Sequence, residues 1–238
     1  MEQQTSLDQQ PATAMASART ISIAAGALYL LTFVSIPTLA LYGQVKSVNY
    51  ILGPGPDTAM IAGGLLEIIV ALAGIGTAVV LFPVLKRQNE AAALGLVASR
   101  TLEASTMFAG VAFLLSAVTL RQAGAGADAL PTSHALVALY DRIFLLGQSF
   151  MPAVNDVLLG FLLYRSRLVP RVLSLIGIVG AAPLVASYLA VLFGLFGHHA
   201  PLAGLGAFPV ALFEFSLGVW LLVKGCDRAA VTALAFNQ

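Results

Sequence analysis

Charged side chains interrupt stretches of this sequence that are otherwise apolar, and they are the residues best able to bind a ligand or a proton. The segment VASRTLEASTMFAG, residues 97–110, carries Arg100 and Glu103 among aliphatic and small residues. Carboxylate and guanidinium groups interact strongly with ions where little water competes with them. The charged residues that lie within apolar stretches are Glu67, Arg100, Glu103, Asp141, Arg142, Asp156 and Glu214.

The spacing around Arg100 indicates one polar helix face. Residues three and four positions apart lie on the same side of a helix. The residues that share this face are Ser99, Arg100, Glu103, Thr106 and Gly110. We therefore expect the two charges to point in one direction.

Two further polar faces have a similar spacing. Asp141, Gln148 and Asn155 recur every seven residues, an interval that drifts by only about 20° per step in a straight helix. Glu67 lies among glycine and alanine residues, which allow helices to approach closely around its carboxyl group. These patterns predict a polar seam between packed helices.

Composition identifies the environment of these helices. Hydrophobic residues make up 59% of the chain, charged residues make up 10%, and the mean hydropathy is +0.91. Soluble domains carry about a quarter charged residues, so the sequence predicts an integral membrane protein. Its formal net charge of +1 argues against a nucleic-acid partner, which requires a basic face.

Apolar segments of roughly 20 residues are long enough to cross a bilayer. The stretch 172–213 lacks charged residues and exceeds one crossing, and the turn-forming sequence GHHAPLAG at 197–204 divides it. The predicted transmembrane helices cover residues 20–42, 59–85, 91–120, 134–164, 172–196 and 203–224. We expect one all-α domain over residues 20–225, a polar disordered tail over 1–19 and a short tail over 226–238.

Basic residues at the helix ends predict the orientation. One set of ends carries Arg19, Lys86, Arg87, Arg165, Arg167, Arg171, Lys224 and Arg228, whereas the other carries Lys46 and Arg121. Positively charged loops remain in the cytoplasm. Both termini are therefore predicted to be cytoplasmic, in a cell (inner or plasma) membrane.

The cost of burying charges in lipid indicates that they face the interior of the bundle. Lipid-facing Arg100 and Glu103 would cost one helix on the order of 5 to 7 kcal/mol. Among the charges within the predicted spans, five acids face two bases. Either some carboxyl groups are protonated, or a cation or cationic ligand completes the site.

Other chemistries find less support in the sequence. The histidines, His134, His198 and His199, lie at predicted helix ends, so no metal or haem site is expected within the membrane. Cys226 is the single cysteine, with no histidine near it in the sequence. We expect no cofactor and no enzymatic activity.

Three segments resemble a known family. They are SRTLEAS at 99–105, LLGFLLYRSRLVPRVLSLIGIVG at 158–180 and EFSLGVWLLVKG at 214–225. They are similar to bacterial membrane proteins grouped as domain of unknown function 4386, and the most specific part is the RSRLVPR turn. The resemblance implies a six-pass inner-membrane protein and no assigned activity, so it supplies no catalytic residue.

The sequence leaves three functions open. The favoured one is a bundle that binds or transports a proton or a small cationic or amphiphilic molecule. The alternative is a structural or regulatory protein in which Arg100 pairs with Glu103 or Glu214 only to fix helix packing. A membrane enzyme that acts on lipid or quinone is the least favoured. The candidate binding residues are Glu67, Arg100, Glu103, Gln148, Asn155, Asp156 and Glu214.

Overall fold

The computed structural model describes residues 2–197 and 200–236. This part of the chain is helical and contains no strand. Six of its helical segments are long and apolar enough to cross a membrane: Ser17–Thr38, Thr58–Leu85, Glu90–Gln122, Ala127–Ser166, Arg171–Leu192 and Pro201–Val223. The predicted fold class and the predicted number of membrane-spanning segments are confirmed.

The helices follow one another with short connections. Their bounds are α1 Glu2–Thr32, α2 Ser35–Leu41, η1 Tyr50–Leu52, α3 Thr58–Leu85, α4 Glu90–Gln122, η2 Ala127–Ala129, α5 Leu130–Phe144, η3 Leu145–Ser149, α6 Met151–Ser166, α7 Arg171–Leu192, α8 Pro201–Val223 and α9 Arg228–Phe236.

Local sequence signals explain several of these boundaries. The side chain of Asn89 accepts a hydrogen bond from the Ala92 amide at 2.9 Å and so caps the start of α4, as asparagine commonly does. Arg167 ends α6 in the left-handed conformation, with φ of 58°. Proline lacks a backbone N–H that a first helical turn would leave unpaired, and Pro201 accordingly begins α8.

The fourth crossing is one long helix with a wide turn inside it. Between α5 and α6 the residues of η3 form a π-helical turn, and Pro152 follows in the first turn of α6. Proline cannot donate the usual helical hydrogen bond, and a π turn is one way in which a helix accommodates such a change. A proline within a helical stretch, such as Pro152, predicts a kink from the sequence, and the structure shows a local widening.

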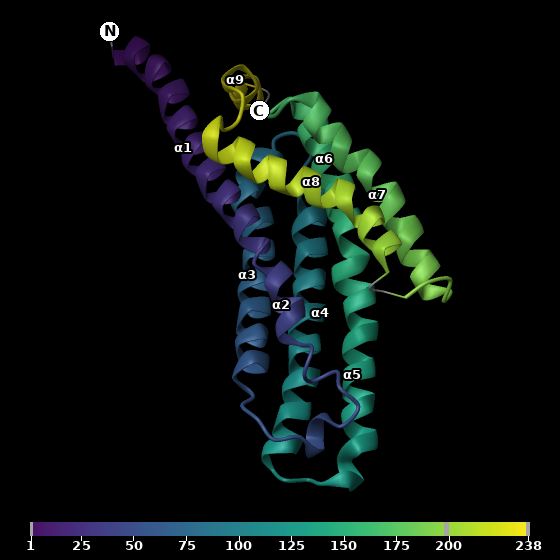
Figure 1. Ribbon diagram of the computed structural model, residues 1–238. Coiled ribbons are helices and arrows are strands. Elements are labelled where there is room, and N and C mark those ends of the chain that lie inside the picture. The colour runs from purple at the N-terminus through teal and green to yellow at the C-terminus, as the bar shows by residue number, and fades with distance from the viewer. Residues whose placement is uncertain (1, 198–199, 237–238) are drawn as a thin grey trace.

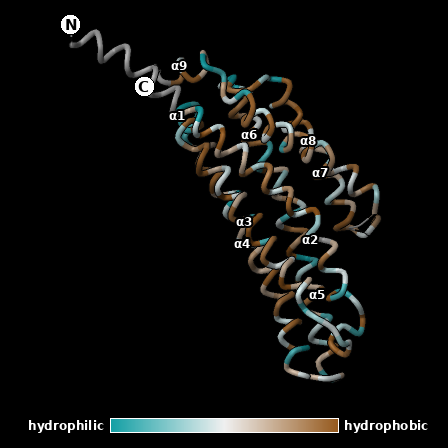
Figure 2. Tube along the Cα trace, turned by 60° about the vertical axis from the view of Figure 1, so that its left-hand side comes forward, coloured by the Kyte–Doolittle hydropathy of each residue, from teal (hydrophilic) through white to brown (hydrophobic). Residues whose placement is uncertain are grey.

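The bundle consists of two inclined parts. In Figure 1, α3, α4 and α5 stand side by side, α8 passes at an angle across the upper part of the view, and α7 packs along α8. Helix α1 contacts both α3 and α8, and α6 contacts α4 and α7. Figure 2 shows that hydrophobic residues predominate along the helices, while hydrophilic residues gather near the upper ends and in the connections.

A close backbone approach joins α1 to α8. A Cβ atom added to Gly26 would lie 2.7 Å from the carbonyl oxygen of Gly218. This distance leaves no room for a side chain, so the glycine allows the two helices to touch. The contact sets the position of α8 and therefore of Glu214, one helical turn before Gly218.

The structure differs from the sequence-based expectation at both termini. The sequence predicts a disordered tail over 1–19, whereas α1 extends back to Glu2. Glutamine, glutamate and alanine favour helices, and a helix that has already formed is easily extended. At the other terminus α9 occupies the expected tail over 226–238, and its Val231 and Leu234 are buried in the same core cluster as Ala18.

The other boundaries differ by a few residues, with one larger difference in the first crossing. The predicted helix over 20–42 is broken after Thr32, where Phe33 and Val34 make short turn-type hydrogen bonds before α2 begins. Helix α5 starts at Leu130, whereas the predicted helix starts at 134, and α7 ends at Leu192 instead of 196.

Candidate functional site

Arg100 lies at the centre of a buried ionic network. Its side chain is 5% exposed, and its Nη1 lies 3.1 Å from Oε2 of Glu103, one turn further along α4. Its Nη2 donates to Oε1 of Glu214 in α8. The guanidinium also lies 5.7 Å from the ring centroid of Tyr29 in α1. Arg100 thus joins three of the six crossings.

Asn155 extends this network to a fourth crossing. Its Nδ2 donates to Oε2 of Glu103 at 2.7 Å, and the residue is fully buried in α6. The same Glu103 oxygen therefore accepts from both Arg100 and Asn155. Two donors hold that carboxylate in one orientation, because each constrains a different direction.

Asp156 is the least satisfied member of the site. It is fully buried next to Asn155, and within the described part of the chain neither carboxylate oxygen has a hydrogen-bond partner. Glu214, Arg100 and Glu103 are close enough to interact with it electrostatically. We call Arg100, Glu103, Asp156 and Glu214 the central cluster.

The central cluster contains more acids than bases. One guanidinium faces three carboxyl groups, which corresponds to a formal charge of −2 if all are ionised. Isolated buried charges cost several kcal/mol each even after relaxation. The arrangement therefore favours the uptake of positive charge.

Glu67 forms a separate buried site, and no basic side chain among the described residues forms an ion pair with it. Its Oε2 accepts from the Tyr42 hydroxyl at 2.5 Å, and its Oε1 accepts from Nε2 of Gln148. The residue is 2% exposed. Both oxygens are satisfied by neutral donors, and Gln148 comes from the π-helical turn η3.

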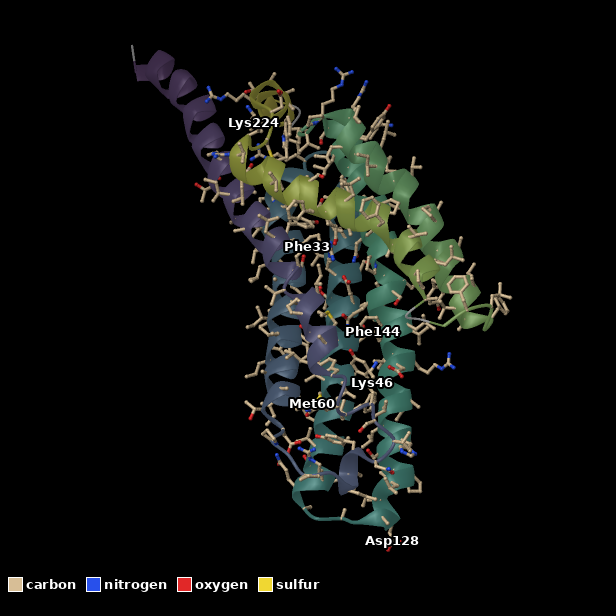
Figure 3. The ribbon with its side chains drawn as sticks, viewed as in Figure 1. Phe33, Lys46, Met60, Asp128, Phe144 and Lys224 are labelled. Carbon is tan, nitrogen blue, oxygen red and sulfur yellow. The ribbon has the colours of Figure 1, made fainter. Side chains whose placement is uncertain are left out.

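A cavity of about 420 Å³ lies against the central cluster. Its charged and amide members are Arg100, Glu103, Gln148 and Glu214, and its remaining lining is mostly apolar. Phe33 and Phe144 belong to this lining, and Figure 3 labels both in the middle part of the molecule. The break between α1 and α2 forms one wall, and α7 and α8 form another. The cavity therefore combines a charged end with mostly apolar walls.

The structure thus assembles most of the predicted site residues. Arg100, Glu103, Asn155, Asp156 and Glu214 lie together, and Gln148 connects the cavity to Glu67.

Asp141 and Arg142 were predicted to face the bundle interior, and that prediction is wrong. Asp141 has a side chain that is 52% exposed and pairs with Lys46 at 2.7 Å, and Arg142 is exposed. The π turn between Asp141 and Asn155 shifts the helix register, so the seven-residue spacing does not keep them on one face. Among the histidines, Nε2 of His134 lies 2.8 Å from the carbonyl oxygen of Val48, and His198 and His199 lie outside the described residues.

Sequence reasoning missed Tyr42, the donor to Glu67. A usable signal was present, since a tyrosine in an apolar segment brings a hydroxyl that requires a partner when buried. In the structure Tyr42 lies just past the end of α2, whereas the sequence predicts it as the last residue of a continuous helix over 20–42.

A second arginine site lies at the opposite end of the bundle from Lys224, near Met60 in Figure 3. Arg121 pairs with Asp57, donates to the Gly55 carbonyl at 2.8 Å and lies 4.4 Å from the Tyr50 ring centroid. Asp57 also accepts from the Tyr50 hydroxyl at 2.6 Å and from Gln122 at 3.1 Å. We call Tyr50, Asp57, Arg121 and Gln122 the loop cluster. Burial and the hydrogen bond to Asp57 raise the pKa of the Tyr50 phenol.

Comparisons with known proteins place the chain in one group. A family model described as domain of unknown function (DUF4386) matches residues 24–225. No curated protein and no solved structure matches the chain. The matched range begins in α1 and ends after α8, so it includes every residue of the two buried sites and their cavity.

Proposed function

The chain belongs to the DUF4386 family, whose description assigns no activity, and we propose that this multi-pass membrane protein binds and transports a small amphiphilic cation in its central cavity. The observation that carries the proposal is the excess of carboxyl groups over Arg100 beside an apolar cavity. A bound cation compensates that charge, and apolar walls accept the rest of the molecule.

Each member of the central cluster has a distinct role in this proposal. Arg100 positions one oxygen of Glu103 and one oxygen of Glu214. In the described part of the chain, no hydrogen bond engages Oε1 of Glu103 or Oε2 of Glu214. These two oxygens are the proposed ligands for the cation. Asp156 adds negative charge behind them without lining the cavity.

Transport requires that the site also exist without the cation. We propose that protons replace the cation on the carboxyl groups, since an empty, fully ionised cluster would be costly in low dielectric. Proton release on cation binding would couple the two movements. The proposed function is binding and transport without chemical conversion of the ligand, so the proposal assigns no enzymatic activity.

The proposed location is the inner membrane of a bacterium, with both termini in the cytoplasm. The clustering of basic residues at the helix ends near both termini supports this orientation.

The first test compares two probe ions of the same shape and opposite charge. Tetraphenylphosphonium is expected to raise the thermal unfolding temperature of the detergent-purified protein, whereas tetraphenylborate is not. Glu214→Gln is expected to fold and to bind tetraphenylphosphonium at least about tenfold more weakly, a loss of about 1.4 kcal/mol. Asp141→Asn, which removes an exposed acid that does not line the cavity, is the matched control and is expected to bind normally. Equal stabilisation by both ions, or an unchanged affinity in Glu214→Gln, would refute the proposal.

A structural or regulatory role is the second candidate. The network from Arg100 through Glu103 to Asn155, together with Glu214, ties α4, α6 and α8 to one another. If these bonds only fix packing, Glu214→Gln lowers the unfolding temperature while neither probe ion changes it in any variant. That result would favour the second candidate over transport.

A further inference from the structure

A second cavity, of about 580 Å³, lies at the end of the bundle that carries Lys224 in Figure 3. It sits between the α6–α7 turn and the α8–α9 turn. Its charged and aromatic lining residues are Arg167, Arg171, Trp220, Lys224, Asp227 and Arg228. None of them lines the central cavity, so its chemistry is independent of the proposed transport site.

The two turns that form this cavity are fixed to each other. The Asp227 amide donates to the carbonyl oxygen of Leu168 at 2.8 Å, across the gap between the turns. Leu168 and Val169 are buried in the core, which anchors the α6–α7 turn from below. Arg167 has a positive φ, a conformation that is unfavourable for a residue with a side chain. The cavity is therefore a built feature of the fold and not a gap between mobile loops.

Positive charge dominates the cavity. Its lining contains four basic residues and the single acid Asp227, whose Oδ1 accepts from the Ala230 amide at 2.9 Å and caps α9. Within the described residues, none of the four basic side chains forms an ion pair. Helices α7 and α9 both begin here, and helix N-termini favour anions.

The position of the cavity indicates where its ligand comes from. One membrane span, Arg171–Leu192, begins beside the cavity, and another, Pro201–Val223, ends beside it. The cavity therefore lies at the level of the lipid headgroups. The adjacent Val172 and Val223 are 71% and 66% exposed. Half-buried Trp220 is of a type enriched at membrane interfaces. Exposed apolar side chains beside a basic cavity suit a ligand with acyl chains better than a free ion.

We propose that this cavity binds the phosphate of an anionic phospholipid, with Arg167, Arg171, Lys224 and Arg228 as the phosphate-binding residues. Arginine and lysine bind phosphate oxygens through charge-assisted hydrogen bonds, and basic pockets between transmembrane helices recognise anionic headgroups. A soluble phosphate compound shares the phosphate chemistry and is the alternative source that the test must exclude.

Trp220 allows a direct measurement, because it is the only tryptophan in the sequence and lines the cavity. In detergent micelles, the full-length protein is titrated with phosphatidylglycerol carrying brominated acyl chains, which quench tryptophan fluorescence at short range. Brominated phosphatidylcholine is the zwitterionic comparison. Phosphatidylglycerol is expected to quench at lower mole fractions than phosphatidylcholine.

Matched variants separate the cavity from the general charge of this end. The double variant Arg167→Gln/Lys224→Gln removes two charges from the cavity. The loss of each charge is expected to weaken phosphatidylglycerol binding about fivefold. Lys86→Gln/Arg87→Gln removes the same charge from the nearby end of α3, outside the cavity, and is expected to leave the preference unchanged. Should the double cavity variant fail to fold, Lys224→Gln alone tests one step of the same series.

Three results would overturn the proposal. They are equal quenching by the two lipids, an equal loss of preference in both double variants, and full displacement of phosphatidylglycerol by millimolar inorganic phosphate. The last result would assign the cavity to a soluble phosphate compound. Persistence of the lipid preference in the presence of inorganic phosphate supports a lipid ligand.

Discussion

The central cluster and the loop cluster both contain an arginine with a carboxylate partner, but they differ in balance. In the loop cluster, Asp57 receives Arg121, Tyr50 and Gln122, so one acid faces one base and both oxygens are engaged. In the central cluster one base faces three acids, and Asp156 has no hydrogen-bond partner in the described part of the chain. A cavity borders the central cluster, and no residue of the loop cluster lines that cavity.

This difference shows that a buried ion pair is not by itself a functional signal. A balanced and fully hydrogen-bonded pair is explained by its effect on loop and helix packing. An excess of one charge beside a cavity has no such explanation within the chain, because removal of the excess would lower the cost of burial. The excess of acids over bases in the central cluster therefore supports the proposal of a cationic ligand.

Removal of the arginine should give the largest effect and separate the two clusters. Arg100→Met leaves three carboxyl groups without a base, and the expected loss of stability is about 3 to 5 kcal/mol. Arg121→Met leaves one acid with two neutral donors, and the expected loss is about 1 to 3 kcal/mol. Thermal and chemical unfolding in detergent measure both. Equal losses would show that the charge excess of the central cluster has no energetic consequence.

Neutralisation of one acid in each cluster should have effects that differ in sign or size. Asp57→Asn weakens an ion pair and is expected to lower the free energy of unfolding by about 1.5 to 3 kcal/mol. Asp156→Asn removes a buried acid that has no bond to lose, and is expected to leave stability unchanged or raise it. Unfolding of the two variants side by side tests this contrast. A larger loss in Asp156→Asn than in Asp57→Asn would contradict it.

Glu67 sharpens the comparison because it is as buried as Asp156 yet hydrogen-bonded at both oxygens. Tyr42→Phe removes one of these donors, with an expected loss of about 1 to 2 kcal/mol. Tyr140→Phe is the control. Its ring packs edge-on to that of Tyr42 with centroids 5.5 Å apart, and its hydroxyl has no partner in the described residues. Similar losses in the two variants would mean that ring packing, and not the bond to Glu67, accounts for the effect.

The smallest expected effect is a pH dependence in the loop cluster. Burial and the hydrogen bond to Asp57 raise the pKa of Tyr50 above its usual value of 10.0, so the folded state keeps the phenol protonated where the unfolded state loses the proton. The stability that this provides is present below about pH 10 and is lost as the pH rises further. Stability of the wild type measured from pH 8 to 11 should therefore fall more steeply than that of Tyr50→Phe. Parallel curves would exclude a contribution from Tyr50.

The parts of the structure that depend on local sequence could be predicted. Six apolar runs indicated six crossings, and the three-residue spacing of Arg100 and Glu103 indicated a shared face, as the structure confirms. The cost of leaving charges in lipid indicated that Glu214 faces the interior, where it and Glu103 were the two possible partners of Arg100, and the structure shows contacts with both. These inferences need only hydropathy and helix geometry.

Features that depend on packing between helices could not be predicted. The π turn at η3 places Asp141 at the surface and brings Gln148 to Glu67. Pro152 indicates an irregularity in this helix, but neither its kind nor its effect on the helix register follows from the sequence. The break after Thr32 was hidden because the surrounding residues are equally apolar. Asp156 and Asn155 are neighbours in the sequence, yet only the fold shows that one is bonded to Glu103 and the other to nothing in the described chain.

The π turn also has a genetic consequence. Because a π turn holds one residue more than an α-helical turn, deletion of a single codon within 145–149 would restore a regular helix without removing a crossing. The helix on either side of the deletion would keep its orientation, because the wide turn already accommodates the extra residue. Asp141 would still face Lys46, and Asn155 and Asp156 would keep their places. A frame-preserving deletion of Gln148 would therefore remove the amide donor to Glu67 and leave the central cluster intact.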